Sequence, residues 1–164
     1  MRQNHCMNLH AAPGTCLLAL AVLAPMRLSA EELMALDPFA QATRGYVQCA
    51  EVAPPLLTAD EARSQAHVRV ERGLRCAMEG KCEPGGAYKR DPETNERVRE
   101  LIASDKRFAN TSLWLTTSRK WVTLQGCVRS RAQQRALVQL VKSQPHVERV
   151  FDETSVGARR KRSR

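Results

Sequence analysis

The sequence lacks the short motifs that mark most catalytic centres. No Cys-x-x-Cys or Cys-x-x-Cys-His occurs, so neither thiol redox catalysis nor covalent haem attachment is indicated. Gly85 and Gly86 are not followed by Gly-Lys-Ser/Thr, which argues against a phosphate-binding loop. His67 lies among charged residues of a predicted helix, His146 follows a proline, and no Ser/His/Asp order or paired-carboxylate motif stands out. We therefore assign no catalytic residue and no cofactor, and we expect a protein that is not an enzyme.

Long apolar runs are also missing. The run Cys16–Ala24 is too short to span a bilayer comfortably. Leu28-Ser29-Ala30 follows it, with a small residue at the last position, and then come Glu31 and Glu32, as in a secretory signal peptide. The sequence predicts a signal peptide over residues 1–30, cleaved after Ala30, with no transmembrane span in the mature chain. Export into the bacterial periplasm is the expected destination, and a retained, uncleaved anchor is the alternative.

Aromatic residues are scarce, at 4% of the chain, whereas basic residues are in excess. The formal net charge is +9 and the isoelectric point about 9.7, which favours acidic partners such as anionic lipid or nucleic acid. The excess is concentrated at the end: residues 31–90 carry eight basic and nine acidic residues, but residues 159–164 carry five basic residues and no acidic one. We predict a basic disordered tail over 157–164, which either keeps the protein soluble or contacts a partner.

Four cysteines remain after the predicted cleavage: Cys49, Cys76, Cys82 and Cys127. They allow three disulfide pairings, among which the sequence does not choose. Cys76 and Cys82 could bridge one another or one could reach Cys49, and Cys127 alternates onto the outer face of its strand, where it could tie the N-terminal region to the sheet. Zinc bound by His67, Cys76 and Cys82 is the rival interpretation, but their spacing matches no common zinc pattern. In an exported protein we expect disulfides and no metal.

The middle of the chain predicts a helical extension. Residues 31–57 lack periodicity and suggest an irregular lead-in with one short helix near Glu31–Leu36. Thr58 and Glu61 then form a capping box, and Gly80 is a suitable left-handed stop for the helix that follows. Its narrow apolar stripe consists of Ala62, Ala66, Val70, Leu74 and Ala77, interrupted by Gly73. We expect residues 58–90 to be a Cys-containing helical extension and linker, whose helix needs a partner surface or a disulfide to hold it.

Alternating apolar residues predict a hairpin in the C-terminal half. Leu113 and Leu115 alternate in one segment, and in Trp121–Val128 the inward positions are Val122, Leu124, Gly126 and Val128. Gly126 has no side chain, so a neighbouring backbone or helix could come close there. The polar segment 117–120 suits the hairpin loop.

Two helices and one more strand complete the expected domain, over residues 91–156. Asp91 is expected as the N-cap, with Pro92 as the first residue, of a helix over about 92–104. Ser130 predicts the start of another helix that Pro145 ends, with an inner face of Ala136, Leu137, Leu140 and Val141. A last strand follows over 147–156, with Val150, Thr154 and Val156 on one side. The predicted fold class is α+β: a helix-strand-strand-helix-strand domain whose three-stranded mixed sheet carries both helices on one face.

This order, with the alternation Val122, Leu124, Gly126 and Val128, resembles the BON domain (bacterial OsmY and nodulation) of bacterial envelope proteins over roughly residues 92–156. The chain departs from the family in two turns, which often contain glycine there: it has Thr117-Ser118-Arg119-Lys120 in the hairpin loop, and His146 between Pro145 and Val147. The resemblance implies a non-enzymatic module that binds phospholipid or supports envelope integrity under osmotic or other stress.

The residues add a specific hypothesis to that resemblance. If Leu115 opposes Val122, the two tryptophans lie diagonally on the outer face of the hairpin, next to basic loop residues. Tryptophan prefers the membrane interface, and basic residues favour anionic lipid. The lipid-contact candidates are Trp114, Trp121, Arg119, Lys120, Arg159, Arg160, Lys161 and Arg162. Alternatively, the N-terminal region covers the tryptophans as a second core. The domain could also act as a protein–protein or peptidoglycan interaction module, whereas nucleic acid is an unlikely partner for an exported protein.

Overall fold

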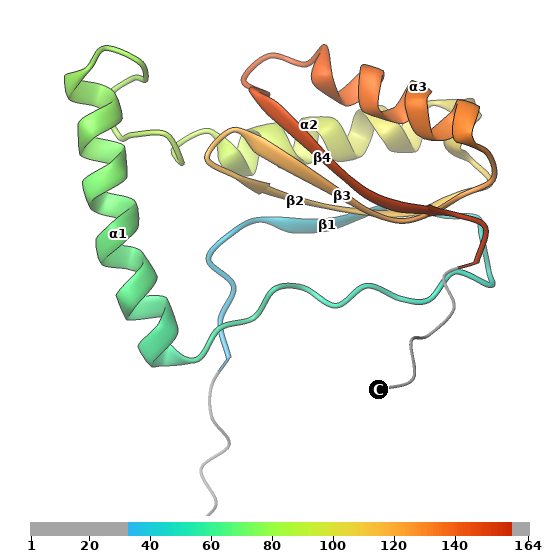
Figure 1. The fold of residues 1–164 in the computed structure, drawn as a ribbon, viewed down its shortest axis with the longest axis horizontal. Helices are drawn as coiled ribbons and strands as arrows, with labels where there is room; N and C mark the ends of the chain where they lie inside the picture. The colour runs from blue at the N-terminus through green and yellow to red at the C-terminus, as the bar shows by residue number, and fades with distance from the viewer. Residues whose placement is uncertain (1–32, 159–164) are drawn as a thin grey trace, which may run out of the picture. The chain divides into compact units, whose positions relative to one another are not determined.

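The computed structural model describes residues 33–158. In chain order its elements are β1 (Phe39–Arg44), α1 (Ala59–Met78), α2 (Asp91–Ser104), a short 3-10 helix (Lys106–Phe108), β2 (Ser112–Ser118), β3 (Trp121–Val128), α3 (Arg131–Lys142) and β4 (Arg149–Val156). The strands form one mixed sheet in the order β1-β2-β3-β4. Pairing is antiparallel between β1 and β2 and between β2 and β3, and parallel between β3 and β4, which α3 connects. Figure 1 shows α2 and α3 on the same face of this sheet.

The sheet has four strands, so the prediction of a three-stranded sheet was wrong by one edge strand. The additional strand β1 lies in the segment that was expected to be irregular, where only Ala40 and Ala42 pack against the core. Alanines give a weak alternation signal, and a bulge between Gln41 and Thr43 interrupts it further. The short helix near Glu31–Leu36 was also wrong within the described part, because Met34 forms an isolated bridge with Leu57.

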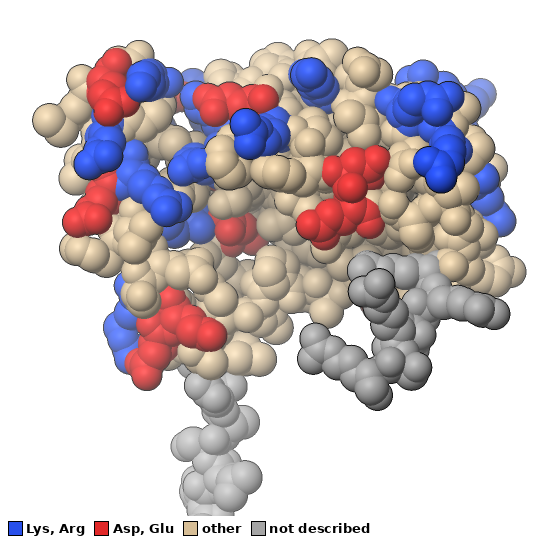
Figure 2. Space-filling view, in the orientation of Figure 1, with Lys and Arg blue, Asp and Glu red and all other residues tan. Residues whose placement is uncertain are grey.

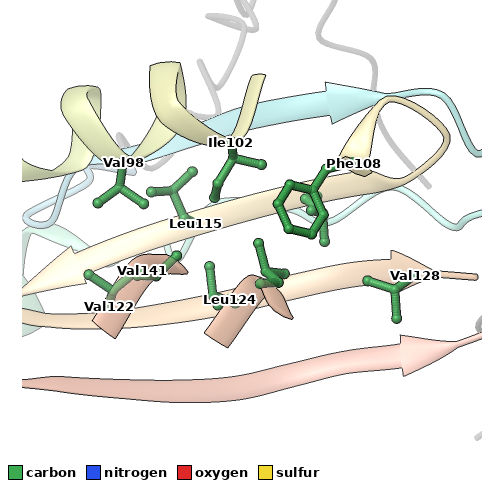
Figure 3. Close-up of a cluster of buried hydrophobic side chains, with 10 residues drawn as sticks. Val98, Ile102, Phe108, Leu115, Val122, Leu124, Val128 and Val141 are labelled. Carbon is green, nitrogen blue, oxygen red and sulfur yellow. The ribbon is translucent and has the colours of Figure 1, made fainter. Parts of the chain in front are cut away.

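The hydrophobic core fills the space between the sheet and the two helices (Figure 3). The inward residues of β3 that were predicted as structural, Val122, Leu124 and Val128, are fully buried. They meet side chains of α2, the 3-10 helix, β2 and α3: Val98, Ile102, Phe108, Leu113, Leu115, Leu137 and Val141. The amphipathic periods of 2 and 3.6 thus converge on one core, as the sequence predicted.

Gly126 has the role that its place in the pattern suggested. Its φ is +112°, a conformation that side chains disfavour. A Cβ there would overlap the carbonyl oxygen of Ser112 and come within 3.0 Å of the Trp114 ring. The missing side chain therefore lets the backbone of β2 and an aromatic ring approach β3 closely.

Helix α1 begins and ends as predicted, and most of its apolar stripe is exposed. The Thr58 hydroxyl accepts a hydrogen bond from the Glu61 amide at 3.3 Å, the Glu61 carboxylate accepts one from the Thr58 amide at 2.9 Å, and Gly80 has φ +65°. The expected apolar stripe is mostly uncovered, since Val70 is 60% and Leu74 61% exposed. Of the two supports expected for this helix, a partner surface or a disulfide, the structure shows the Cys76–Cys82 disulfide at its end.

A glycine contact holds α1 against the linker in place of the apolar stripe. Gly73 is buried, and a Cβ on Gly86 would lie 2.7 Å from its Cα, so the two backbones touch. One turn earlier, the Arg69 guanidinium bonds the Asp37 carboxylate at 2.7 Å and lies 4.0 Å from the centre of the Tyr88 ring. The residue that interrupts the apolar stripe is thus the one that packs.

The two turns that depart from the family pattern accept left-handed backbone without glycine. His146, before β4, has φ +63°. In the β2–β3 connection the strands extend further than predicted, and only Arg119 and Lys120 remain as the turn, with φ of 54° and 64°. This two-residue turn is the starting point of the candidate site.

Candidate functional site

The β2–β3 turn is held from outside the hairpin by a buried carboxylate. Asp91 accepts a hydrogen bond from the amide of Arg119 at 2.6 Å and another from the amide of Lys120 at 2.9 Å. The expected role of Asp91 as the helix N-cap was wrong: α2 begins at Asp91, after Arg90, and the carboxylate bonds the turn. Two successive left-handed residues other than glycine are costly, and these hydrogen bonds compensate for part of that cost.

Burial affects the protonation of this carboxylate. Asp91 is 2% exposed, and burial raises its pKa above the ordinary value of an aspartate. The hydrogen bonds from the amides of Lys120 and Arg119 oppose that rise in pKa because they favour the charged form. The turn is therefore held by the two oxygens of a carboxyl group that is almost inaccessible to water.

Trp121 is the first residue after the turn and is half-buried on the outer face of the sheet. The Arg119 guanidinium carbon lies 4.0 Å from the centre of its ring, and that of Arg149 lies 5.3 Å away. The ring meets Phe151 edge to face, with the ring centres 5.7 Å apart. Arg149 and Phe151 come from β4, because the parallel register sets Trp121 opposite Arg149. We call Arg119, Trp121, Arg149 and Phe151 the hairpin patch.

The hairpin patch carries positive charge without a neutralising carboxylate. Lys120 forms an ion pair with Glu148 at 3.1 Å, but within residues 33–158 no ion pair joins Arg119 or Arg149 to an acidic side chain. Guanidinium groups stacked on aromatic rings remain free to bind an anion with their edges. This arrangement can hold an anionic group beside an apolar, half-exposed indole.

A groove of about 530 Å³ adjoins the patch, between the turn and α1. Its lining includes Arg72, Arg75, Cys76, Glu79, Lys81, Ala87, Arg119, Lys120, Trp121 and Glu148. Figure 2 shows Lys and Arg side chains on both α1 and the neighbouring end of the sheet. The groove combines cations from α1, which precedes the domain, with cations from the hairpin.

Trp114 does not join Trp121, so the hypothesis of an exposed tryptophan pair was wrong. Leu115 opposes Leu124 and not Val122, which sets Trp114 opposite Gln125, away from the turn. Trp114 is only 5% exposed. The hairpin loop is two residues shorter than assumed, and the register moves accordingly.

The segment that follows β1 covers this end of the sheet, as the alternative interpretation held for Trp114. The backbone amide of Tyr46 donates a hydrogen bond to the Ser112 hydroxyl at 3.0 Å, and the hydroxyl donates to the Tyr46 carbonyl at 3.1 Å. Cys49 forms a disulfide with Cys127 on the outer face of β3, with 5.7 Å between their Cα atoms. Trp121, at the other end of β3, is left uncovered by this segment.

The second disulfide joins Cys76 to Cys82, whose Cα atoms are 5.5 Å apart, at the end of α1. Both cysteines of the rival zinc set are thereby bridged, and the imidazole of His67 pairs with Glu71 at 3.3 Å on the surface. Within residues 33–158, no group of three or more His, Cys, Asp or Glu side chains could hold a metal ion. The pairing that the sequence left open is thus 49–127 and 76–82.

Several predicted features lie outside the described residues. These are the signal peptide over 1–30 and the tail residues Arg159, Arg160, Lys161 and Arg162. Among the helices that the structure does describe, none is long and apolar enough to cross a bilayer.

The sequence interpretation missed Arg149, Phe151, Arg72 and Arg75. Arg149 and Phe151 flank Val150, so the alternation of the last strand already set them on the outer face. Their place beside Trp121 required the parallel register of β3 and β4. No sequence signal paired Arg72 and Arg75 of α1 with the hairpin.

Comparison with known proteins bears on the C-terminal half. Residues 90–158 match the family model described as the BON domain. No curated protein and no protein of solved structure matches the chain. The matched range begins beside Asp91 and ends after β4, so it contains the hairpin patch but excludes α1 and β1.

Proposed function

Because residues 90–158 match the BON domain, we propose that the chain is an exported, non-enzymatic protein of the bacterial envelope that binds anionic phospholipid. BON domains are known in envelope or phospholipid-binding proteins. The periplasm is the proposed location, and support of the envelope under osmotic or other stress is the proposed role. The contact surface is the hairpin patch.

The single observation that carries this proposal is the environment of Trp121. The centre of its half-buried ring lies 4.0 Å from the Cζ atom of Arg119 and 5.3 Å from that of Arg149. Indole rings favour the interface between water and acyl chains, and each basic residue near an anionic membrane contributes about 1 kcal/mol. A rigid turn presents both features together, because Asp91 fixes its backbone.

Vesicle co-sedimentation tests the proposal. We expect the full-length protein to sediment with vesicles that contain phosphatidylglycerol and to remain in solution with pure phosphatidylcholine. Added salt should release it, since screening shortens the reach of surface charges. Equal sedimentation with both vesicle types, or with neither, would contradict the proposal.

Trp121→Ala identifies the contact surface. If binding buries roughly 50 Å² more of the indole, at about 25 cal/mol per Å², the variant loses about 1.3 kcal/mol, or about tenfold in affinity. Tyr46→Ala is the matched control, because Arg129 lies 3.5 Å from the Tyr46 ring centre at the opposite end of β3. Both variants remove an aromatic ring under an arginine, and only Trp121→Ala should weaken binding.

Exposed apolar side chains on α1 favour a second candidate function, docking on another envelope component. Val70, Leu74 and Met78 follow one another at helical spacing and are 60%, 61% and 87% exposed. Apolar docking should persist at high salt and be lost in a Leu74→Ser, Met78→Ser double variant on isolated envelopes. Release of the wild type by salt alone would instead favour the lipid contact.

A further inference from the structure

The groove between α1 and the hairpin has two walls from different parts of the chain. Arg72 and Arg75 come from α1, which lies outside the residues that match the BON domain. Arg119 and Trp121 come from the hairpin inside the matched range. The space of about 530 Å³ is open to solvent and borders the half-exposed indole. A group that enters it would be contacted from both sides.

Close packing holds α1 in place on its side of the groove. Gly73, the residue after Arg72, is in backbone contact with Gly86 of the linker. The Cys76–Cys82 disulfide lies at the end of the helix. On the same helix, Arg69 bonds Asp37 at 2.7 Å. These contacts involve the residues next to Arg72 and Arg75 but not their side chains, which remain available for a ligand.

The charges that line the groove do not balance. Its two carboxylates are already engaged, Glu79 with Lys81 at 2.8 Å and Glu148 with Lys120 at 3.1 Å. No ion pair within the described part of the chain neutralises the three arginines of the lining, Arg72, Arg75 and Arg119. Three arginines that form no ion pair with a carboxylate therefore line the same groove. Planar guanidinium groups bind phosphate oxygens in pairs, which makes phosphate the chemically matched anion.

We propose that this groove binds the phosphomonoester headgroup of an anionic lipid, with Arg72 and Arg75 of α1 opposing Arg119 of the hairpin. A phosphomonoester carries about −1.5 to −2 charges at neutral pH and three terminal oxygens, whereas a phosphodiester carries about −1. Three unpaired cations suit the more highly charged group. The lipid source follows from the adjoining Trp121, whose indole can enter the membrane interface while the phosphate occupies the groove. This inference rests on the proposed function and assigns α1 a role in lipid selectivity.

The test compares two double variants of equal charge. Arg72→Gln, Arg75→Gln removes the α1 wall, and Arg131→Gln, Arg135→Gln removes two exposed arginines of α3 that lie outside the groove lining. Vesicles contain either phosphatidic acid, a phosphomonoester, or phosphatidylglycerol, a phosphodiester, at matched surface charge. We expect the wild-type protein to prefer phosphatidic acid by about tenfold and Arg72→Gln, Arg75→Gln to abolish that preference. The α3 variant should weaken binding to both lipids equally and keep the preference.

The outcomes separate this inference from the proposed function. Wild-type protein that binds neither anionic vesicle contradicts both. Wild-type protein that binds both vesicles equally, or two double variants that behave alike, contradicts only the phosphomonoester groove. Inorganic phosphate provides the last arm: we expect it to compete only at millimolar concentration. Tight binding of free phosphate without binding to phosphatidic acid vesicles would assign the groove to a soluble anion and overturn the lipid source.

Discussion

Replacing Asp91 by alanine tests how the hairpin turn is held. Arg119 and Lys120 occupy left-handed backbone, at about 1–2 kcal/mol for each residue that is not glycine. The variant would remove the acceptors of both turn amides, at 2.6 Å and 2.9 Å, without removing apolar packing. An amide that loses its acceptor costs about 1–3 kcal/mol, and the lower half of that range applies because the turn residues are only partly buried. For the two amides together, we expect Asp91→Ala to lower the free energy of unfolding by about 2–4 kcal/mol.

Equilibrium urea unfolding measures this loss, as a lower midpoint with an unchanged slope. Asp91→Asn keeps one carbonyl oxygen as acceptor, so its loss should be about half as large. Asp60→Ala is the control for a carboxylate: Asp60 is exposed at the start of α1, and its loss should stay within about 0.5 kcal/mol. A loss from Asp91→Ala no larger than that of Asp60→Ala would refute the reasoning.

The pH dependence of the same variants gives an independent readout. Burial raises the pKa of Asp91, so the folded chain binds this proton more tightly than the unfolded chain does. The stability linked to that proton is fully present below the unfolded pKa and is lost as the pH rises through the folded pKa. Relative to Asp91→Asn, the wild type should therefore gain stability as the pH falls from neutral toward about 4, near the ordinary pKa of an aspartate. A relative loss of stability over that range would mean that the amide hydrogen bonds outweigh burial.

The remaining predictions concern the other end of the sheet. Replacing Cys49 and Cys127 together by alanine removes a disulfide that joins residues 78 positions apart. The unfolding free energy should fall by about 4 kcal/mol, and the fluorescence of Trp114 should shift to the red. Unchanged stability and emission would show that the covering segment does not need the disulfide. Gly126→Ala should lower the free energy of unfolding, measured with heat or urea, by at least about 2 kcal/mol, because its Cβ has no space. Gly157→Ala, also at positive φ but in open space, should lower it by about 1 kcal/mol. Similar losses in the two variants would exclude close packing as the cause.

The buried Asp91 carboxylate and the hairpin patch are connected through the β2–β3 turn. Asp91 stands at the start of α2, inside the core domain, and fixes Arg119 through its amide. Arg119 in turn lies over Trp121. A loss of the Asp91 contact should therefore loosen the hairpin patch before it unfolds the domain, and lipid binding of Asp91→Asn should weaken while its core remains folded.

The sequence was sufficient for most of the C-terminal core. Val122, Leu124 and Val128 alternate with a period of two, and Leu137 and Val141 repeat at helical spacing; all five are buried where those periods predicted. Local patterns of this kind succeed because burial on one face selects both the element and its orientation. The caps at Thr58 and Ser130 were visible for a similar reason, since a capping side chain bonds an amide only a few residues away.

Strand β1 and the hairpin register were not determined by local sequence. The alanines of β1 bury too little surface to show a pattern, and pairing with β2 supplies the order. The register of the hairpin depended on whether Arg119 and Lys120 could accept left-handed backbone. A distant carboxylate, Asp91, decided that question. Trp114 was placed wrongly as a direct consequence, because a change in loop length moves every cross-strand neighbour.

By itself, the sequence determined which residues are buried in the BON-like half, where its helices begin, and that cysteines and basic residues are the chain's distinctive chemistry. Only the tertiary structure decided that Cys49 joins Cys127, that Arg149 meets Trp121, and that two arginines of α1 face the hairpin. The physical reason is range. Periodicity and capping act within one or two turns of chain, whereas a site built from β4, the hairpin and α1 depends on contacts between residues that the sequence keeps far apart.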